Sequence, residues 1–254
     1  MKESNFARVI NICSNLLENS PIAHEARCYL DNRLSKSSQK KFGFGFFPPQ
    51  EDLNVLLSFI DKEDLFKQNL IYEKNIEDRL SMLFSPMEQH NLIMPYRDVS
   101  GAIIAIVGRS LLDDEHRTEL RISKYKNTSF EKSRNLFGLF ESKYSIIEKN
   151  CVYIVEGQFD CIQAHDKNIR NVVALGSSNM SMEQLILLLR YTNNINLLLD
   201  NDEAGELGRE RIIEKFGRFA NIKNYRLPQG FKDLDELLKE VEIIDDDLEQ
   251  FLRQ

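Results

Sequence analysis

The chain has 254 residues, of which 42% are hydrophobic, and a formal net charge of −7. This length allows one large domain or two ordinary ones, each with a sizeable core. No apolar run approaches the roughly 18 residues that a membrane helix needs, and the first ten residues lack the apolar segment of a signal peptide. The sequence therefore predicts a cytoplasmic protein without a membrane partner.

Cysteine and histidine are both scattered along the chain. The four cysteines never form a CxxC pair, and the four histidines are equally dispersed. A zinc ribbon or finger needs closely spaced pairs of such ligands, so we expect no zinc in this chain. We expect reduced cysteines in or near the core: Cys13, Cys28, Cys151 and Cys161.

The first half of the chain predicts a mixed α+β region. Residues 1–34 have the apolar spacing of helices, and the Gly- and Pro-rich stretch 42–50 interrupts that pattern. Residues 51–60 and 61–70 resemble two short helices. The clearest hairpin spans 91–112, where two apolar runs flank the polar turn RDVSG.

Basic side chains concentrate at residues 121–134, in a chain that is acidic overall. Residues 1–150 carry 21 basic and 21 acidic side chains, whereas residues 151–254 carry 12 and 19. The basic stretch could face triphosphates or a nucleic-acid backbone, although a solvated basic loop is the simpler interpretation. Its charged residues are Arg121, Lys124, Lys126, Lys132 and Arg134, against the single acid Glu131.

Strands alternate with helices from residue 151 onward. This alternation predicts an α/β domain with a mainly parallel sheet flanked by helices. The predicted strands are 151–155, 171–175 and 194–199, and the predicted helices are 158–169, 181–192 and 203–219. We place a boundary near residue 148 and expect three regions: 1–148, 149–240, and an acidic C-terminal helix or tail over 241–254 that is solvated.

Acidic residues follow the predicted strands at several points. Ligands of open parallel sheets bind outside the carboxyl ends of the strands. We therefore expect six carboxylates to leave the same edge of one sheet: Glu156, Asp160, Asp200, Asp202, Asp233 and Asp235. Their mutual repulsion would raise their pKa values unless a cation compensated them.

A hard divalent cation would compensate this cluster, because Mg²⁺ takes carboxylate oxygens and shares its coordination with substrate phosphates. Each acid also has a simpler interpretation. Asp200 and Asp202 could cap a helix, Asp160 could be a surface helix residue, and Asp233 and Asp235 could mark a helix N-terminus. The joint spacing of the three acidic segments favours the metal site.

Residues 151–238 resemble the Toprim domain of topoisomerases, bacterial primases and some nucleases. The segments that carry the resemblance are VYIVEGQFD, VALGSS, LLLDNDEAGELGRE and LPQGFKDLDELL. The resemblance implies that Glu156, Asp200 and Asp202 are the catalytic metal ligands for Mg²⁺ or Mn²⁺. It also implies that Asp160, Asp233 and Asp235 form a supporting acidic shell. Gly157 and Gly205 would let the backbone turn tightly at the site.

The first half resembles the catalytic core of the DnaG-type bacterial primase. The matching segments are EARCYLDNRLSKSSQKKFGFGFFPP, the predicted hairpin, SKYKNTS and FEKSRNLFGLFES. Together with the Toprim-like half, the resemblance covers roughly residues 22–240. It implies that Arg33, Arg109, Lys124 and Lys132 bind nucleotide phosphates, template or heteroduplex.

The resemblance implies templated synthesis of RNA primers from NTPs on single-stranded DNA, in a bacterial or phage-infected cell. The zinc-binding and helicase-binding domains of a full-length bacterial primase are not evident in this sequence, so we expect either an excised core or a compact phage or mobile-element primase that takes these functions from other chains. We therefore expect a replicative helicase or a separate zinc-binding primase module as partner.

Two rival functions remain open. A Toprim nuclease would use the same acids, although neither a P-loop motif nor the further tyrosine-bearing domain of a topoisomerase is evident. A decayed core could instead serve as a non-catalytic replisome-binding module.

Overall fold

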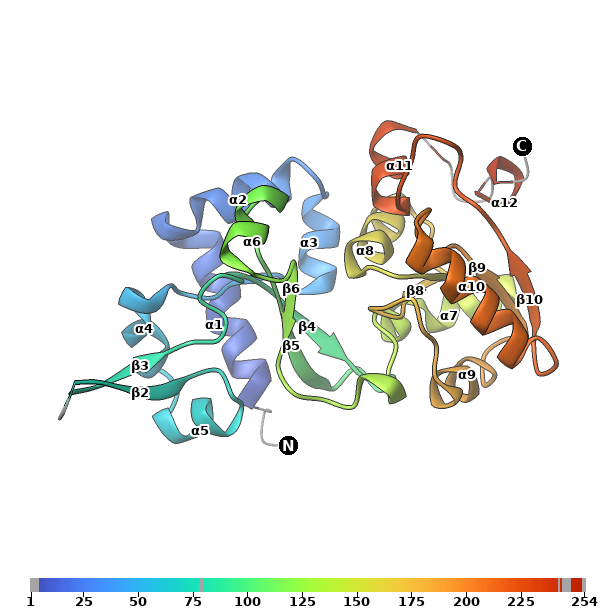
Figure 1. Cartoon of the computed structure of the whole chain (residues 1–254). Helices are drawn as coiled ribbons and strands as arrows, with labels where there is room; N and C mark the ends of the chain where they lie inside the picture. Colours follow the sequence, from blue (N-terminus) through green and yellow to red (C-terminus); the bar gives the residue numbers. More distant parts are fainter. Residues whose placement is uncertain (1–4, 78–79, 242, 244–247, 253–254) are drawn as a thin grey trace. The chain divides into compact units, whose positions relative to one another are not determined.

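The computed structural model of the chain describes residues 5–77, 80–241, 243 and 248–252 (Figure 1). The chain forms two compact units. The first unit is Met1–Tyr96 with Ile103–Phe130, and the second is Arg97–Ala102 with Glu131–Gln254.

The first unit combines short helices with two antiparallel arrangements of strands. Its helical elements are α1 (Asn5–Asn19), η1 (Pro21–Ala23), α2 (His24–Asp31), α3 (Lys36–Phe42), η2 (Gln50–Asp52), α4 (Asn54–Leu57), α5 (Lys62–Lys67) and α6 (Asp114–Leu120). Its strands are β1 (Gly45–Phe46), β2 (Tyr72–Glu77), β3 (Leu80–Phe84), β4 (Leu92–Arg97), β5 (Ile103–Arg109) and β6 (Tyr125–Asn127). The predicted helical pattern is confirmed over residues 5–31, where Pro21 divides it, and residues 1–4 lie outside the described part.

A four-stranded sheet of order β1-β4-β5-β6 forms the centre of this unit. Strands β4 and β5 are the predicted hairpin, and Gly101 in the turn between them has φ +93°, a value that favours glycine. The basic stretch supplies the edge strand β6, which pairs antiparallel with β5. Apolar side chains from α1, α4 and α5 pack with β4 and β5 in one core cluster.

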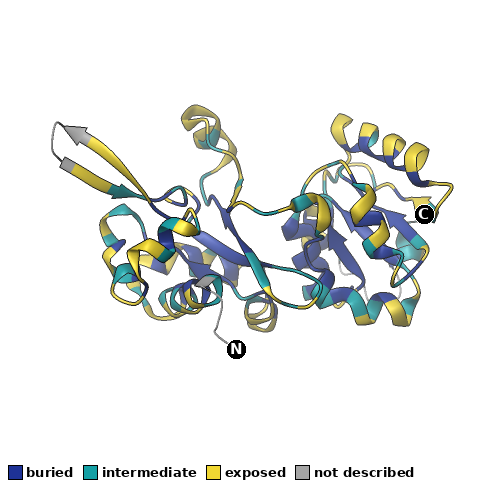
Figure 2. Cartoon of the chain, turned by 90° about the horizontal axis from the view of Figure 1, so that it is seen from below, coloured by how far each residue is buried: buried dark blue, intermediate teal, exposed yellow. Residues whose placement is uncertain are grey.

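The hairpin of β2 and β3 is one of several elements that the sequence pattern did not predict. Its two strands pair only with each other, and most of its described side chains are exposed (Figure 2). The Tyr72 and Phe84 rings stack at 5.8 Å across the hairpin. Because most described residues of both strands are exposed and Leu83 is only partly buried against the core cluster, the alternation of polar and apolar residues that marks a half-buried strand is weak here.

The second unit is an α/β layer structure, which confirms the predicted fold class. Its strands are β7 (Val152–Val155), β8 (Val172–Ala174), β9 (Asn194–Leu197) and β10 (Asn221–Asn224), in the order β10-β9-β7-β8. All neighbouring pairs are parallel. Its helical elements are η3 (Lys132–Arg134), α7 (Leu139–Lys149), α8 (Gln158–Asp166), α9 (Met182–Leu188), α10 (Glu203–Phe216), α11 (Leu234–Glu240) and α12 (Leu248–Phe251).

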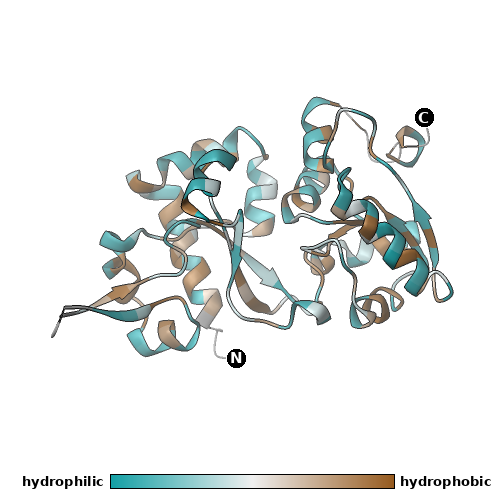
Figure 3. Ribbon diagram, in the orientation of Figure 1, coloured by the Kyte–Doolittle hydropathy of each residue, from teal (hydrophilic) through white to brown (hydrophobic). Residues whose placement is uncertain are grey.

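Strands β7 and β8 are continuous apolar runs that are fully buried, as expected for strands covered on both faces, whereas the edge strand β10 is mostly exposed (Figure 3). Val152 and Ile154 join a core cluster with residues of α7, α9 and α10. Tyr153 and Val155 alternate with them and are also buried. Helix α8 packs against β7, β8 and α11.

The second unit begins earlier than the change in sequence pattern near residue 148. Helix α7 packs on β8, and Phe137 exchanges main-chain hydrogen bonds of 3.0 Å with Ala174. The hairpin turn also joins this unit, because Arg97 forms an ion pair with Glu141 at 3.0 Å. Residues 131–148 therefore fold with the parallel sheet even though they precede its first strand.

The predicted C-terminal region 241–254 contains the short helix α12, but its described residues are not all solvated as expected. Ile243 and Leu248 are buried. Glu249 accepts hydrogen bonds from Tyr225 at 2.6 Å and Lys223 at 3.0 Å. The end of the chain therefore packs beside β10, although residues 242 and 244–247 lie outside the described part. No helix among the described residues has the length and apolarity to cross a membrane.

Candidate active site

Two acidic side chains distant in sequence meet at the carboxyl ends of β7 and β9. These strands are parallel neighbours, so their carboxyl ends lie at the same edge of the sheet. Glu156 follows β7 directly, and Asp200 follows the buried residues after β9. The main-chain amide of Asp200 donates a hydrogen bond to Oε1 of Glu156 at 3.3 Å.

The other predicted acids lie around this pair. The charges of Glu156, Asp233 and Asp202 all act on Asp200, and those of Asp233, Asp200 and Asp235 act on Asp160. The structure thus brings the three acidic segments together at one sheet edge. We call this edge the acidic rim and define it by Glu156, Asp160, Asp200, Asp202, Asp233 and Asp235.

Asp160 connects two helices of the rim. Its side chain is only 5% exposed, so its interpretation as a surface helix residue is wrong. Oδ2 accepts a hydrogen bond from the Gly157 amide at 3.1 Å, and Oδ1 accepts one from the Asp235 amide at 2.8 Å. Asp160 therefore fixes the start of α8 against the start of α11.

Asp202 and Asp233 are helix caps as well as rim residues. Oδ1 of Asp202 accepts a hydrogen bond from the Gly205 amide at 2.9 Å, at the start of α10. Oδ1 of Asp233 accepts one from the Glu236 amide at 2.8 Å, at the start of α11. The capping interpretation is correct for one oxygen of each carboxylate, and the same caps hold both side chains at the rim.

The rim raises the pKa values of its own carboxyls. Burial and the charges of Glu156, Asp233 and Asp202 raise the pKa of Asp200 to about 7. Burial, and then the charge of Asp233, raises the pKa of Asp160 well above its usual range. Burial also raises the pKa of Glu156. Each of these carboxylates is therefore disfavoured when ionised, unless positive charge is added.

A divalent cation fits the chemistry of this donor set. Carboxylate oxygens are the ligands that Mg²⁺ and Mn²⁺ prefer. Among the described residues, no three His, Cys, Asp or Glu side chains already form a group that could hold a metal ion. Mg²⁺ keeps several waters when it binds, so a partly formed ligand set is compatible with it. The metal and its six predicted ligands remain a proposal.

Asp235 also has a partner of its own. The residue is 8% exposed, and its Oδ2 accepts a hydrogen bond from Lys239 Nζ at 2.8 Å, one helical turn along α11. This ion pair places Asp235 in the packing between α11 and α8.

Gly157 and Gly205 are both required by close contacts; Gly157 lies in the bend between β7 and α8, as predicted, and the predicted tight turn is wrong for Gly205. Neither residue has a positive φ, and Gly205 lies inside α10. A Cβ at Gly205 would overlap the carbonyl oxygen of Asp200 and lie 3.0 Å from Oε1 of Glu156. A Cβ at Gly157 would overlap Oδ2 of Asp160. Both glycines let the backbone approach the acids directly.

Arg209 is a rim neighbour that the sequence did not reveal. It is 1% exposed, donates a hydrogen bond to the Leu199 carbonyl, and pairs with Glu206 at 3.2 Å. Its charge lowers the pKa of Glu156, opposing the effect of burial. Arg209 follows Gly208 on the buried face of α10, so helical periodicity could have predicted its burial. Its contact with the Leu199 carbonyl could not be predicted in this way.

Lys132 lies at the carboxyl end of β8, in the same unit as the acids. Its ammonium group donates a hydrogen bond to the Gly176 carbonyl, and burial lowers its pKa. Gly176 has φ +72°, and a Cβ there would lie 2.7 Å from Cε of Lys132. The Gly176 amide also donates a hydrogen bond to the Glu156 carbonyl at 2.8 Å. Lys132 is therefore fixed beside the segment that carries Glu156.

The other predicted basic residues belong to the first unit. Arg109 is only 7% exposed, with its guanidinium 5.3 Å from the Tyr29 ring centroid and 5.2 Å from that of Tyr125. Arg33 lies over the same Tyr29 ring at 5.0 Å. Lys124 is exposed, and its carbonyl accepts a hydrogen bond from the Ser110 amide at 3.0 Å. Sequence reasoning missed the tyrosines that hold the two arginines.

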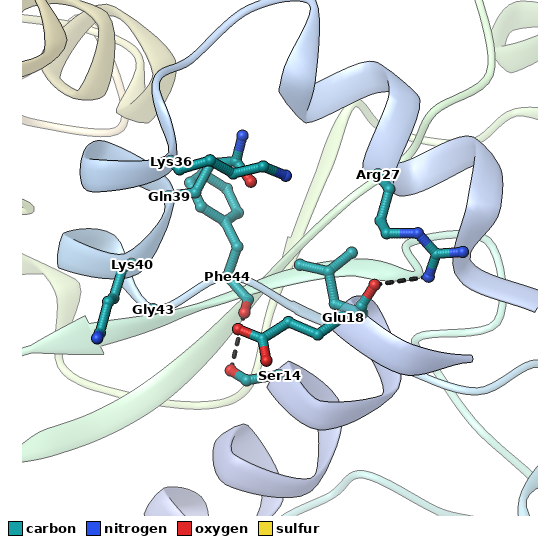
Figure 4. Close-up of a pocket in the computed structure, with 9 residues that line it drawn as sticks. Ser14, Glu18, Arg27, Lys36, Gln39, Lys40, Gly43 and Phe44 are labelled. Carbon is teal, nitrogen blue, oxygen red and sulfur yellow. Dashed lines mark hydrogen bonds between the residues drawn. The ribbon is translucent and has the colours of Figure 1, made fainter. Parts of the chain in front are cut away.

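A cavity of about 500 Å³ in the first unit is a less suitable site (Figure 4). Arg27 at its edge donates hydrogen bonds to the Leu17 and Ser20 carbonyls, both at 2.7 Å. Lys36 pairs with Asp31, and Glu18 adds a negative charge to the lining. Two of its cationic groups are therefore already engaged, and its described lining includes none of the predicted site residues.

Comparison with known proteins relates both halves of the chain to one kind of enzyme. Residues 13–143 match the family model described as DNA primase catalytic core, N-terminal domain, and residues 153–238 match the Toprim-like model. A DNA primase of Aquifex aeolicus is 28% identical over 241 residues, which are 94% of this chain and 47% of the relative. The chain thus spans about half the length of this curated relative.

Solved structures agree with the family models. The Escherichia coli primase catalytic core has a TM-score of 0.79 and 27% identity, covering 97% of this chain and 78% of its own. A DnaG primase catalytic domain bound to ssDNA has a TM-score of 0.79 and 25% identity, with the same coverages. With both halves of the fold and the acidic rim accounted for, the chain belongs to the family of DnaG-type DNA primase catalytic cores.

Proposed function

We propose that this chain synthesises short RNA primers on single-stranded DNA by metal-dependent nucleotidyl transfer. The observation that carries the proposal is the meeting of Glu156 and Asp200, with Asp202, at one sheet edge. Membership of the primase family supports it, as does the likeness to a primase domain bound to ssDNA.

Glu156, Asp200 and Asp202 would hold the divalent cation, and Asp160, Asp233 and Asp235 would keep them in place. When bound, Mg²⁺ or Mn²⁺ would neutralise charge on the nucleotide triphosphate. The caps formed by Asp202 and Asp233 fix the acids before any nucleotide arrives, so little reorganisation is required.

In the proposed reaction the 3′-hydroxyl of the growing primer attacks the α-phosphorus of an NTP, and its proton passes to solvent water. The bond from that phosphorus to the bridging oxygen breaks, and pyrophosphate leaves. Lys132 could turn from the Gly176 carbonyl to a phosphate oxygen, since both are hydrogen-bond acceptors. Catalysis would come mainly from positioning and electrostatic stabilisation.

The first unit would bind template or NTP through its basic residues. Lys124 is exposed and suits a phosphate contact. Arg109 is held between two tyrosines, so we propose that it presents a fixed guanidinium edge together with Arg33. A replicative helicase or a separate zinc-binding module is the proposed partner, in the cytoplasm of a bacterial or phage-infected cell.

A primer-synthesis assay tests the proposal. The chain is incubated with mixed-sequence single-stranded DNA, labelled NTPs and Mg²⁺ or Mn²⁺, with and without a candidate helicase. Labelled RNA that requires both template and metal supports primer synthesis. Shortening of the DNA without RNA would establish a nuclease instead. Binding of DNA with neither product would leave the non-catalytic module.

A further inference from the structure

The residue between the two central aspartates holds a loop against the acidic rim. Nδ2 of Asn201 donates hydrogen bonds to the Leu227 carbonyl at 2.9 Å and the Phe231 carbonyl at 3.0 Å. Its main-chain amide donates a third to the Lys232 carbonyl at 2.7 Å. One residue thus makes three hydrogen bonds to the segment 227–232, which connects β10 to α11.

These hydrogen bonds fix the main chain at Lys232, from which its side chain extends. The Lys232 amide is fixed from the other direction, because it donates a hydrogen bond to Oε2 of Glu236 at 2.7 Å. Nζ of Lys232 then lies 3.9 Å from Oδ2 of Asp202, while its side chain remains 65% exposed. The loop turns at Gly230, whose φ is +97°.

The charge of Lys232 reaches beyond its ion pair with Asp202. It opposes the pKa rise of both Asp200 and Glu156. Exposed ion pairs at this distance are weak, so Lys232 can leave Asp202 when a better anion arrives. Its ammonium group therefore stabilises the rim and remains accessible to a ligand.

We propose that Lys232 is a built-in counterion of the acidic rim that transfers to the triphosphate of a bound NTP, and that Asn201 is the positioning residue that holds it there. This inference rests on the proposed function, because it takes the rim as the site of metal and NTP. Lys232 and the divalent cation share the same carboxylates, so they compete in the absence of nucleotide. With NTP present, the anionic phosphates attract both cations.

The affinities for Mn²⁺ and for NTP should therefore change in opposite directions when the charge of Lys232 is removed. Lys232→Met keeps the aliphatic stem and removes the ammonium group. We expect Mn²⁺ to bind the nucleotide-free variant about three- to tenfold more tightly, because a nearby like charge is removed. We expect NTP to bind about three- to tenfold more weakly in the presence of metal. Lys223→Met is the matched control, since Lys223 lies on β10 and pairs with Glu249 of α12, which is not a residue of the acidic rim.

Isothermal titration with Mn²⁺ alone measures the first effect and requires no catalysis. A second titration uses a non-hydrolysable NTP analogue at saturating Mn²⁺. Unchanged Mn²⁺ affinity in Lys232→Met, or NTP affinity that stays the same or increases, would overturn the proposal. If the wild-type chain makes primers but Lys232→Met gives either of these results, only the inference about Lys232 is contradicted. If Mn²⁺ affinity and NTP affinity shift in opposite directions in Lys232→Met but the wild-type chain makes no primers, only the proposed reaction is contradicted.

A double-mutant cycle tests the role of Asn201. Asn201→Ala removes the hydrogen bonds to the Leu227 and Phe231 carbonyls, so we expect its Mn²⁺ affinity to rise as in Lys232→Met. In the double variant the two effects should not add, because one residue acts through the other. Additive effects would show that Asn201 does not position Lys232. If Asn201→Ala fails to fold, Asn201→Ser retains a donor and should show a smaller change in the same direction.

Discussion

The main-chain amide of Asp200 donates a hydrogen bond to the carboxylate of Glu156, 44 positions earlier in the chain. This contact joins the ends of two neighbouring parallel strands and places two acidic groups where burial disfavours their charges. The charges of the acidic rim therefore destabilise the metal-free chain, and added positive charge relieves this repulsion.

Asp200→Asn should make the metal-free chain more stable. The substitution removes one charge from a partly buried cluster in which the pKa of Asp200 is raised to about 7. We expect a gain of about 1 kcal/mol in the free energy of unfolding, measured by urea denaturation in EDTA. Glu203→Gln is the control, because Glu203 is exposed at the start of α10, and it should change stability little. A loss of stability in Asp200→Asn would contradict the account of mutual repulsion.

The metal-free chain should lose stability as pH rises from about 4 to about 7. The folded state raises the pKa of Asp200 to about 7, so it keeps a proton that the unfolded state releases near pH 4. The stabilising contribution of that proton is fully present below the unfolded pKa and is lost as pH rises through the folded pKa. The raised pKa values of Asp160 and Glu156 act in the same direction.

Denaturation at pH 5 and pH 7.5 measures this slope, and saturating Mg²⁺ should restore stability at the higher pH. Asp200→Asn should flatten the pH dependence. An equal slope in the wild type and the variant would show that Asp200 is not a source of it.

Gly205→Ala should damage both folding and activity. The added Cβ would overlap the Asp200 carbonyl and crowd the Glu156 carboxylate, so α10 must shift away from the rim. We expect a loss of about 1–3 kcal/mol of stability and little remaining primer synthesis. Ala204→Ser, at the exposed neighbouring position, serves as control. Full activity in Gly205→Ala would mean that the rim tolerates movement of the α10 start.

Lys124→Ala should weaken template binding at low salt. Lys124 is exposed in the first unit, so its removal deletes a phosphate contact with little effect on folding. We expect the slope of log affinity against log salt to fall in magnitude by about 1. Fluorescence anisotropy with a labelled DNA strand measures it, with Lys67→Ala as the exposed control in the same unit. Identical salt slopes for the wild type and Lys124→Ala would remove Lys124 from the interface.

Arg109→Lys should destabilise the first unit although charge is conserved. The guanidinium lies over the rings of Tyr29 and Tyr125, and a lysine ammonium does not stack in this way. We expect a cost of about 1 kcal/mol in the free energy of unfolding, read from thermal unfolding. Arg8→Lys should be neutral, because Arg8 is exposed and a lysine can also donate a hydrogen bond to the Phe59 carbonyl. Equal melting temperatures for both variants would show that the stacking contributes nothing.

The convergence of the acids could be predicted because it follows from sheet geometry. Parallel strands joined through helices carry their carboxyl ends to one edge, so a sequence that places Glu156 and Asp200 after such strands places them together. The capping of α10 by Asp202 could also be predicted, because it is a local contact between residues three positions apart.

The remaining parts of the site depend on contacts that no local pattern encodes. Asn201 reaches carbonyls 26 and 30 positions away, and its side chain has no periodic signature. Arg109 is buried by Tyr29, which lies on a different element. The docking of the C-terminal segment likewise depends on Glu249 meeting Tyr225 across 24 positions.

Primer synthesis by the wild type and by Asp200→Asn is the most direct test of the central claim. Labelled NTPs, single-stranded templates and Mg²⁺ or Mn²⁺ are supplied to both proteins, and circular dichroism verifies that both are folded. The account predicts template-dependent RNA from the wild type and none above background from the variant. Equal amounts of RNA from the two proteins would contradict it.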